Sequence, residues 1–437
     1  MTRASKARVA GGLASHLGLV AALVACVCPA AAQATSAAAR FSAPRVLDRS
    51  LQARQPRVAA TESGELIATW IRQGRVFAIR RLPGGGVLRQ QLWSGGRRSG
   101  AAQDLLVAAP DGSAIVAWSA GGRMYVDTRR AGHGFARVAP GGANRIAAMT
   151  VAIDSAGGAV VAWEQASSGR RPGAIRLARC STVASRCTAP VTLASSGLQP
   201  RAGIDDGGVA TVAWISDRAV IARDVPPRGG AAPLQRWRTA GGVSGIHVSV
   251  APDGATTIGW GAEAPSGDRI ARAVYRPGGG RFSKPFTLGG DLVGFSPLTT
   301  APIGGSWWAF FTGLGGTPLA RYQGPTRVVQ DATSNVESGP IDNLALSGDL
   351  GGAAAAAWET DITVNVALAA PGATSANAAR VGPTRGLSPS IGAFPQVAIS
   401  SRVVAVVWLE RPPFDPLDVS RSGSGRVVLA TAARSQG

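Results

Sequence analysis

One short pattern recurs along the whole chain, and it limits the possible folds more than any other feature. Each copy is an apolar segment that ends on an aromatic residue, which we call the anchor, and anchors follow one another at intervals of 45 to 51 residues. Self-similarity with a period of this size is typical of repeat architectures. The eight anchors are Trp70, Trp118, Trp163, Trp214, Trp260, Phe311, Trp358 and Trp408.

A glycine lies six residues before each of the first seven anchors, whereas the eighth unit has Arg402 at this position. In the sixth unit we choose Phe311 over Trp307 and Trp308 as the anchor, because Gly305 and Pro297 then keep the spacing of the other units. Glycine supplies the positive φ angle that a tight hairpin needs. The seven glycines are Gly64, Gly112, Gly157, Gly208, Gly254, Gly305 and Gly352.

Each unit also has room for two further strands after the anchor. A third apolar segment follows a polar loop, as at residues 76–82, 124–128 and 270–275, and a Gly-rich turn then leads to a fourth segment at 282–288. Four strands in one such repeat are typical of a blade of a β-propeller. The sequence therefore predicts an all-β chain built from four-stranded blades.

The two ends of the repeat region complement each other. Residues 40–47 match the fourth-strand segment 281–288 at five of eight positions, while the last unit stops after its third strand at 427–430. We predict a single eight-bladed propeller over residues 35–437 whose last blade is completed by the N-terminal strand. The alternative is seven blades with an open arrangement.

The first 34 residues have the features of a secretory signal. Arg3, Lys6 and Arg8 precede an apolar stretch at 17–28, and Ala-Gln-Ala ends at Ala34. A segment needs about 20 residues to cross a bilayer, and this stretch is shorter. No later run is long and apolar enough to cross one. We expect an extracellular or cell-envelope protein without a transmembrane segment; the alternative is a lipoprotein anchored at Cys26.

The cysteine count is informative once residues 1–34 are removed. Only Cys180 and Cys187 remain. A pair of cysteines in an exported protein is expected to be oxidised. We predict a disulfide between them, because no second pair and no nearby histidine favours a redox or metal site.

The charge is strongly basic but does not indicate a nucleic-acid protein. The formal net charge is +20, and nearly all of the bases are arginines spread evenly along the chain. Nucleic-acid surfaces usually cluster their basic and aromatic residues. We expect no nucleic acid as a specific ligand, although anionic polymers outside the cell could be attracted.

By its repeat and its complementary ends, the chain resembles the sialidase-like family of bacterial propellers over nearly all of residues 35–437. The resemblance is one of architecture, and it implies a propeller directed at glycans. The family's Asp-box, Ser-x-Asp-x-Gly-x-Thr-Trp, places Trp three residues after Gly, whereas here the anchor follows at six. The Asp-box is thus absent, and we transfer no catalytic residue from the family.

Few residues suit catalysis. The family's tyrosine nucleophile could match only Tyr125, Tyr275 or Tyr322, which fall on predicted third strands. His133 and His247 are the histidines that remain outside 1–34, too few for a multi-histidine metal site, and His247 fits a hydrogen-bonded strand residue. We predict no metal, no cofactor and no catalytic residue.

In a four-stranded meander, the turns between second and third strands share one face with the connections between units. We call this the loop face, and the opposite face, which carries the turns between first and second strands, the hairpin face. Carboxylates gather after the anchors on the loop face, and an insert at 411–418 adds two more. The candidate binding residues are Glu164, Asp217, Glu263, Glu359, Asp361, Glu410, Asp415 and Asp418.

The hairpin face combines turn aspartates, such as Asp111 and Asp253, with arginines that end third strands. These arginines include Arg80, Arg129, Arg130, Arg176, Arg276 and Arg321. Aspartate is favoured in turns for its local hydrogen bonds. We expect exposed Arg–Asp pairs here, each worth at most about 1 kcal/mol.

These observations predict an exported, monomeric, non-enzymatic propeller that binds an extracellular glycan or protein on its loop face. The alternative is a glycoside-cleaving enzyme of sialidase-like type. A retaining glycosidase needs two carboxyl groups about 5 Å apart, and an inverting one needs a wider pair.

Overall fold

The computed structural model describes residues 40–95, 101–138, 145–167, 172–289, 299–303, 306–310, 319–329, 341–360, 363–370, 377–382, 391–411 and 425–434. The chain divides into two compact units, Met1–Thr35 and Ser36–Gly437, and all of these residues belong to the second. Within them the regular structure is β-strand, as the repeat predicts, and no helix could cross a membrane.

The strands of the first four repeat units belong to three sheets, one of which also includes strands from the end of the chain. Their bounds are β1 (Arg45–Ala60), β2 (Leu66–Arg72), β3 (Arg75–Arg81), β4 (Val87–Trp93), β5 (Ala101–Ala108), β6 (Ala114–Ala120), β7 (Arg123–Arg129), β8 (Ala136–Val138), β9 (Ile146–Ile153), β10 (Gly158–Gln165), β11 (Gly173–Ser181), β12 (Arg186–Cys187), β13 (Val191–Ile204), β14 (Ala210–Ser216), β15 (Ala219–Val225) and β16 (Gln235–Arg238).

The remaining units follow the same order. Their bounds are β17 (Val243–Val250), β18 (Thr256–Glu263), β19 (Arg269–Arg276), β20 (Phe286–Gly289), β21 (Thr299–Ile303), β22 (Ser306–Phe310), β23 (Leu319–Gln323), β24 (Thr326–Val329), β25 (Ile341–Gly348), β26 (Ala354–Thr360), β27 (Thr363–Ala369), β28 (Asn377–Gly382), β29 (Ile391–Ile399), β30 (Val403–Arg411) and β31 (Gly425–Ala433).

Antiparallel meanders are the building blocks of the second unit. Four sheets are simple four-stranded meanders, such as β5-β6-β7-β8 and β17-β18-β19-β20. Two larger sheets arise where one long strand serves two successive meanders: β13 pairs with both β11 and β14, and β1 pairs with both β31 and β2.

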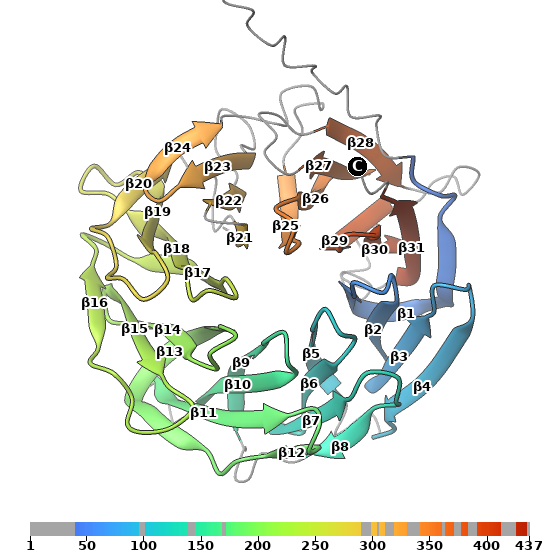
Figure 1. The fold of residues 1–437 in the computed structure, drawn as a ribbon, viewed down its shortest axis with the longest axis horizontal. Helices are drawn as coiled ribbons and strands as arrows, with labels where there is room; N and C mark the ends of the chain where they lie inside the picture. The colour runs from blue at the N-terminus through green and yellow to red at the C-terminus, as the bar shows by residue number, and fades with distance from the viewer. Residues whose placement is uncertain are drawn as a thin grey trace, which may run out of the picture. The chain divides into compact units, whose positions relative to one another are not determined.

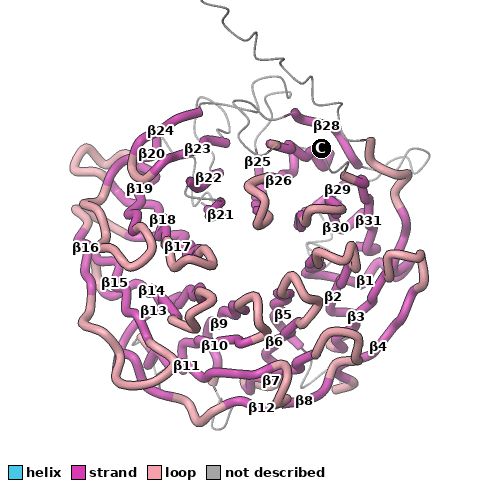
Figure 2. The backbone as a smooth tube through the Cα atoms, viewed as in Figure 1, coloured by secondary structure: helices cyan, strands magenta, loops and turns pink. Residues whose placement is uncertain are grey.

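The sheets follow one another around a ring (Figures 1 and 2). The first strands of successive meanders, β1, β5, β9, β13, β17, β21, β25 and β29, contact one another in this order, and β29 contacts β1. This is the architecture of a β-propeller, as predicted. The predicted count of eight blades, with seven as the alternative, stays a prediction.

The N-terminal segment completes the last meander. Arg45 is paired with Leu429 and Val46 with Val428, and the backbone N–H of Ser42 donates to the carbonyl of Thr431 at 2.7 Å. Phe41 packs against the hydrophobic cluster of the last two meanders, as Phe282 does in the fifth unit. The prediction that residues 40–47 act as a fourth strand is confirmed.

The hairpins explain the glycine that precedes each anchor. Six of the seven glycines have φ between +74° and +97°, and Gly305 lies outside the described residues. In the eighth unit the turn is tighter, since the N–H of Ser400 donates to the carbonyl of Val403. Arg402 is therefore accommodated without the positive φ of the other turns.

The anchors pack between neighbouring sheets, as predicted. Trp214 packs with Val160 and Ala162 of the preceding unit, and its side chain is 1% exposed. Phe311 lies outside the described residues, so its role as the sixth anchor stays a prediction. In the same unit Trp307 faces the preceding sheet and stacks on Tyr322 at 4.4 Å between ring centroids.

Register shifts occur in most first strands, and in three of them the bulge falls directly before a proline. Gln55, Gln199 and Phe394 have φ of +52°, +51° and +53°, and a register shift lies at each of them. Each precedes a proline, which disfavours the right-handed helical region for the residue before it. The bulges lie near the ends of these strands that adjoin the loop face.

The disulfide is present. Cys180 and Cys187 are bonded and sit opposite each other in the β11–β12 pair. The bond closes the outer hairpin of the third unit, as predicted.

Candidate functional site

Three of the predicted loop-face carboxylates are buried. Glu164, Glu359 and Glu410 are 6%, 7% and 1% exposed. Glu164 Oε2 accepts a hydrogen bond from the backbone N–H of Gln199 at 3.2 Å, and Glu359 Oε2 accepts one from that of Phe394 at 3.2 Å. Both donors are the positive-φ residues of a bulge in the following unit. These two carboxylates therefore hold neighbouring units together.

The third buried carboxylate is held by an arginine. Glu410 Oε2 lies 2.9 Å from Nε of Arg426 on the neighbouring strand β31. A buried carboxylate paired in this way is a structural contact, and it is not open to a ligand. Asp361, Asp415 and Asp418 lie outside the described residues.

Two predicted residues remain exposed on the loop face. Glu263 accepts a hydrogen bond from the backbone N–H of Gly242 at 3.2 Å. Asp217 has a side chain that is 85% exposed. Asp217 also lines a hollow on this face.

The hollow has a volume of about 420 Å³ and belongs to the fourth unit. It lies between the β14–β15 turn and the end of β16. Its lining residues are Asp217, Arg218, Arg236, Arg238, Thr239 and Ala240. We call it the β14–β16 hollow.

Local strand pairing explains why these residues meet. Ser216 pairs with Ala219, so Asp217 and Arg218 form a two-residue turn, in which Asp217 has a φ of +54°. Ala219 pairs in turn with Arg238 on β16. The N–H of Thr239 donates to the carbonyl of Arg218 at 2.8 Å, and its Oγ1 lies within hydrogen-bond distance of the carbonyls of Arg218 and Gly241, at 3.0 and 2.7 Å.

The arginines of β16 alternate with a buried tryptophan. Trp237 is 9% exposed and stacks on Trp260 of the next unit. Because successive side chains of a strand point to opposite faces, Arg236 and Arg238 lie together on the other face. The packing of Trp237 thus fixes the strand that presents both arginines to the hollow.

The hollow is positively charged. Asp217 Oδ2 lies 3.7 Å from Nη2 of Arg236, and the two side chains are 85% and 46% exposed. Such a pair is weak. Within the described part of the chain no carboxylate forms a salt bridge with Arg218 or Arg238.

Basic side chains also gather on the first strands. His247 Nδ1 accepts a hydrogen bond from the N–H of Thr300 at 3.2 Å. Burial, together with the positive charge of Arg201, lowers the pKa of His247 to about 4. The imidazole is therefore neutral at pH 7, and His247 is a hydrogen-bonded strand residue, as predicted. Burial and the charge of Arg57 likewise lower the pKa of Arg201.

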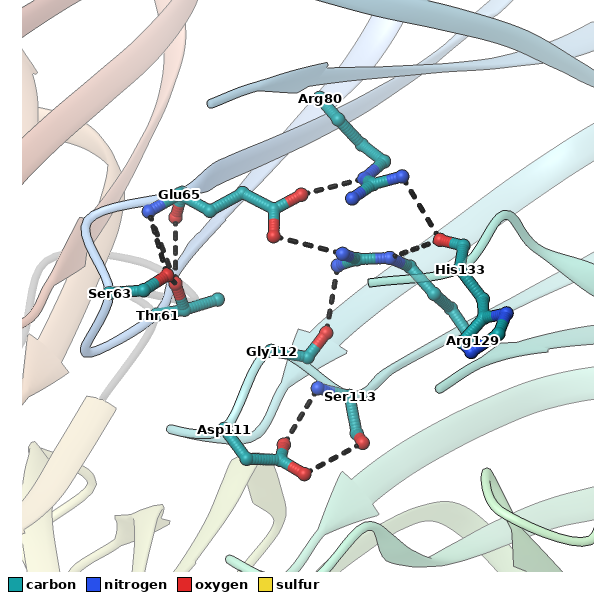
Figure 3. Close-up of polar contacts among 9 residues, drawn as sticks. All are labelled: Thr61, Ser63, Glu65, Arg80, Asp111, Gly112, Ser113, Arg129 and His133. Carbon is teal, nitrogen blue, oxygen red and sulfur yellow. Dashed lines mark hydrogen bonds and ion pairs between the residues drawn. The ribbon is translucent and has the colours of Figure 1, made fainter. Parts of the chain in front are cut away.

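On the hairpin face Arg80 and Arg129 contact Glu65, and not the turn aspartates that were expected as their partners (Figure 3). Glu65 lies 2.6 Å from Nε of Arg80 and 2.9 Å from Nη2 of Arg129, which belongs to the next unit. Arg129 is fully buried and also donates to the carbonyls of Gly112 and His133. This is an interface between units and not a set of exposed surface pairs.

The turn aspartates accept hydrogen bonds from residues of their own turns. Asp111 accepts hydrogen bonds from the N–H and the hydroxyl of Ser113, and Asp253 accepts one from the N–H of Ala255. The predicted role of these aspartates in local hydrogen bonding is confirmed.

Sequence reasoning missed Arg218, Arg236, Arg238 and Thr239. One signal was available, because Gln235-Arg-Trp-Arg238 has the alternation of a half-buried strand with two bases on its outer face. Nothing in the sequence shows that the end of this strand meets the turn at Asp217.

Comparisons with known proteins define the class of the fold. No family model matches the chain, and no curated protein matches its sequence. The Dos1 propeller superimposes on 91% of this chain and 96% of its own length, with a TM-score of 0.53 at 9% identity. The BP39L lectin from Burkholderia pseudomallei covers 76% of this chain and 99% of its own, with a TM-score of 0.50 at 13% identity.

A prolyl endopeptidase is also similar over 84% of this chain, with a TM-score of 0.50 at 9% identity. This chain spans only 55% of that protein's length. At these identities the similarities show the fold alone. The chain is thus a β-propeller protein by architecture.

Proposed function

We propose that the protein is an exported, monomeric β-propeller that binds a glycan at the β14–β16 hollow without cleaving it. The observation that carries this proposal is the hollow itself, where exposed polar side chains surround about 420 Å³ on the predicted ligand face. Arginine donors, the Asp217 acceptor and the Thr239 hydroxyl are groups that match the hydroxyls of a saccharide.

Two further observations support export. The disulfide between Cys180 and Cys187 is typical of an oxidising compartment. Residues 1–34 have the pattern of a signal, which we propose is removed to leave 35–437. The BP39L neighbour is a lectin, and glycan binding is therefore compatible with this fold.

Binding is favoured over cleavage because the buried loop-face carboxylates have structural partners. Glu164 and Glu359 accept backbone hydrogen bonds, and Glu410 pairs with Arg426. A glycosidase needs one carboxyl group that can give up a proton to the leaving oxygen and a second that acts on the sugar.

A glycan array of residues 35–437 tests the proposal, followed by titration of the best glycan. In one variant Asp217→Ala is combined with Thr239→Ala. The matched control is Asp268→Ala with Ser266→Ala, an exposed Asp and hydroxyl pair in the next unit's β18–β19 loop on the same face. Loss of a charge-assisted hydrogen bond should weaken binding at least about tenfold in the first variant, and the control should be nearly unchanged.

Two results would overturn the proposal. Equal binding by the Asp217 variant and the control would place the ligand elsewhere. Release of new reducing ends from any bound glycan would support the alternative, a glycoside-cleaving enzyme.

A further inference from the structure

The charge of the β14–β16 hollow indicates which glycans it takes, an inference that rests on the proposed function. Three guanidinium groups and one carboxylate line it. The single pair, Asp217 with Arg236, is 3.7 Å long and exposed, so water and salt weaken it. The hollow therefore retains a net positive charge that its own residues do not cancel.

The arginines are presented by backbone that cannot easily move. Arg236 and Arg238 are two residues apart on one face of β16, whose other face is packed through Trp237. At about 3.3 Å per residue, their Cα atoms lie about 6.6 Å apart. The backbone of Arg218 is joined to the same strand end by the hydrogen bond from the N–H of Thr239.

Guanidinium groups bind planar carboxylates and sulfates through paired N–H donors. Two arginines side by side, with a third that lines the same hollow, can engage such a group while neighbouring hydroxyls reach Asp217. Residues 35–437 carry a formal charge of +17, which is the +20 of the full chain less the three bases of residues 1–34, and this charge adds long-range attraction for a polyanion. On the hairpin face, by contrast, Arg80 and Arg129 are paired with Glu65.

We propose that the β14–β16 hollow binds acidic saccharides, with a carboxylate or sulfate group held by Arg218, Arg236 and Arg238. Asp217 accepts hydrogen bonds from the hydroxyls beside the acidic group. Neutral glycans bind weakly, because they bring no negative charge to the three guanidinium groups.

The test compares two triple variants of residues 35–437 that lose the same charge. One is Arg218→Gln, Arg236→Gln and Arg238→Gln. The matched control is Arg89→Gln, Arg228→Gln and Arg281→Gln, three exposed arginines that form no salt bridge within the described chain. The probes are polygalacturonate for carboxylate, heparin for sulfate, amylose as a neutral glycan and polyphosphate as an anion without sugar, all at about 150 mM salt.

We expect the unmodified protein to bind polygalacturonate or heparin at least about tenfold more tightly than amylose or polyphosphate. The hollow variant should lose at least about tenfold, and the control at most about threefold. Whichever of the two acidic probes binds more tightly identifies the acidic group. Equal losses of affinity in both variants would overturn the inference, because binding would then depend on net charge alone. Binding of polyphosphate as tight as that of the acidic glycans would overturn it for the same reason.

Different results would contradict this inference and the proposed function. If amylose or another neutral glycan binds and is lost with Asp217→Ala and Thr239→Ala, the hollow is a glycan site but not an acidic one. If no glycan binds, both proposals are wrong.

Discussion

At the scale of single residues, buried polar side chains join one repeat unit to the next. Glu65 is the clearest case, because its two oxygens contact arginines from two different units (Figure 3). The carboxylate balances two guanidinium groups that are almost fully removed from water. Its removal would leave both charges buried without compensation.

We therefore expect Glu65→Gln to lower the free energy of unfolding by about 3–5 kcal/mol. Denaturant unfolding followed by tryptophan fluorescence measures this loss. Asp217→Asn, which affects only an exposed pair, should cost at most about 1 kcal/mol. Similar losses of stability for the two substitutions would show that the Glu65 carboxylate does not stabilise the contact between the two units.

His247 gives a prediction for pH. Its pKa is about 4 in the folded chain and 6.5 when unperturbed, so between these values the unfolded chain binds more protons. This residue's contribution to stability is full above pH 6.5 and is lost as the pH falls toward 4. In His247→Asn the melting temperature should fall less steeply over this window than in the unmodified protein. Identical slopes would contradict the assignment of a neutral imidazole with a lowered pKa at His247.

At the scale of elements, the repeat was sufficient to predict the strands but not their contacts between units. Third strands such as β7 and β19 lie within one or two residues of the predicted segments, because alternation and turn chemistry are local properties. The hairpin glycines were predicted for the same reason.

The bulges and their partners were not predicted. Gln199 before a proline gave a hint of a break in the strand, but its hydrogen bond to Glu164 depends on how two units pack. For this reason Glu164 and Glu359 were expected to meet a ligand, whereas the structure places them against backbone. The hollow at Arg236 and Arg238 likewise depends on which strand end meets which turn.

The disulfide is an element-scale feature with a measurable effect. Replacement of Cys180 and Cys187 by alanine opens an eight-residue loop in the outer hairpin. The chain-entropy account predicts a loss of about 2.5 kcal/mol in the free energy of unfolding. Mass spectrometry of the exported protein without reductant should detect no free thiol at these positions, and two alkylated thiols would contradict the bond.

At the scale of the whole propeller unit, closure depends on a strand that is distant in sequence. Residues 40–47 pair with β31 and so cover an edge that would otherwise be exposed. An unpaired edge can template aggregation. Complementary ends were visible in the sequence because a missing strand and an orphan strand are local patterns, which is why this long-range contact could be predicted.

A chain of residues 48–437 should therefore aggregate or melt well below a chain of residues 35–437. Size-exclusion chromatography and thermal unfolding compare the two. A monomeric 48–437 chain with an unchanged melting temperature would refute the shared last sheet.

We infer that a ligand binds the loop face at the β14–β16 hollow. Hydrogen–deuterium exchange of residues 35–437, with and without the best glycan from the array, tests it most directly. We predict slower exchange at residues 216–219 and 236–240 when the glycan is bound. Protection confined to the hairpin turns at 61–65, 109–113 and 205–209 would place the ligand on the opposite face and contradict the claim.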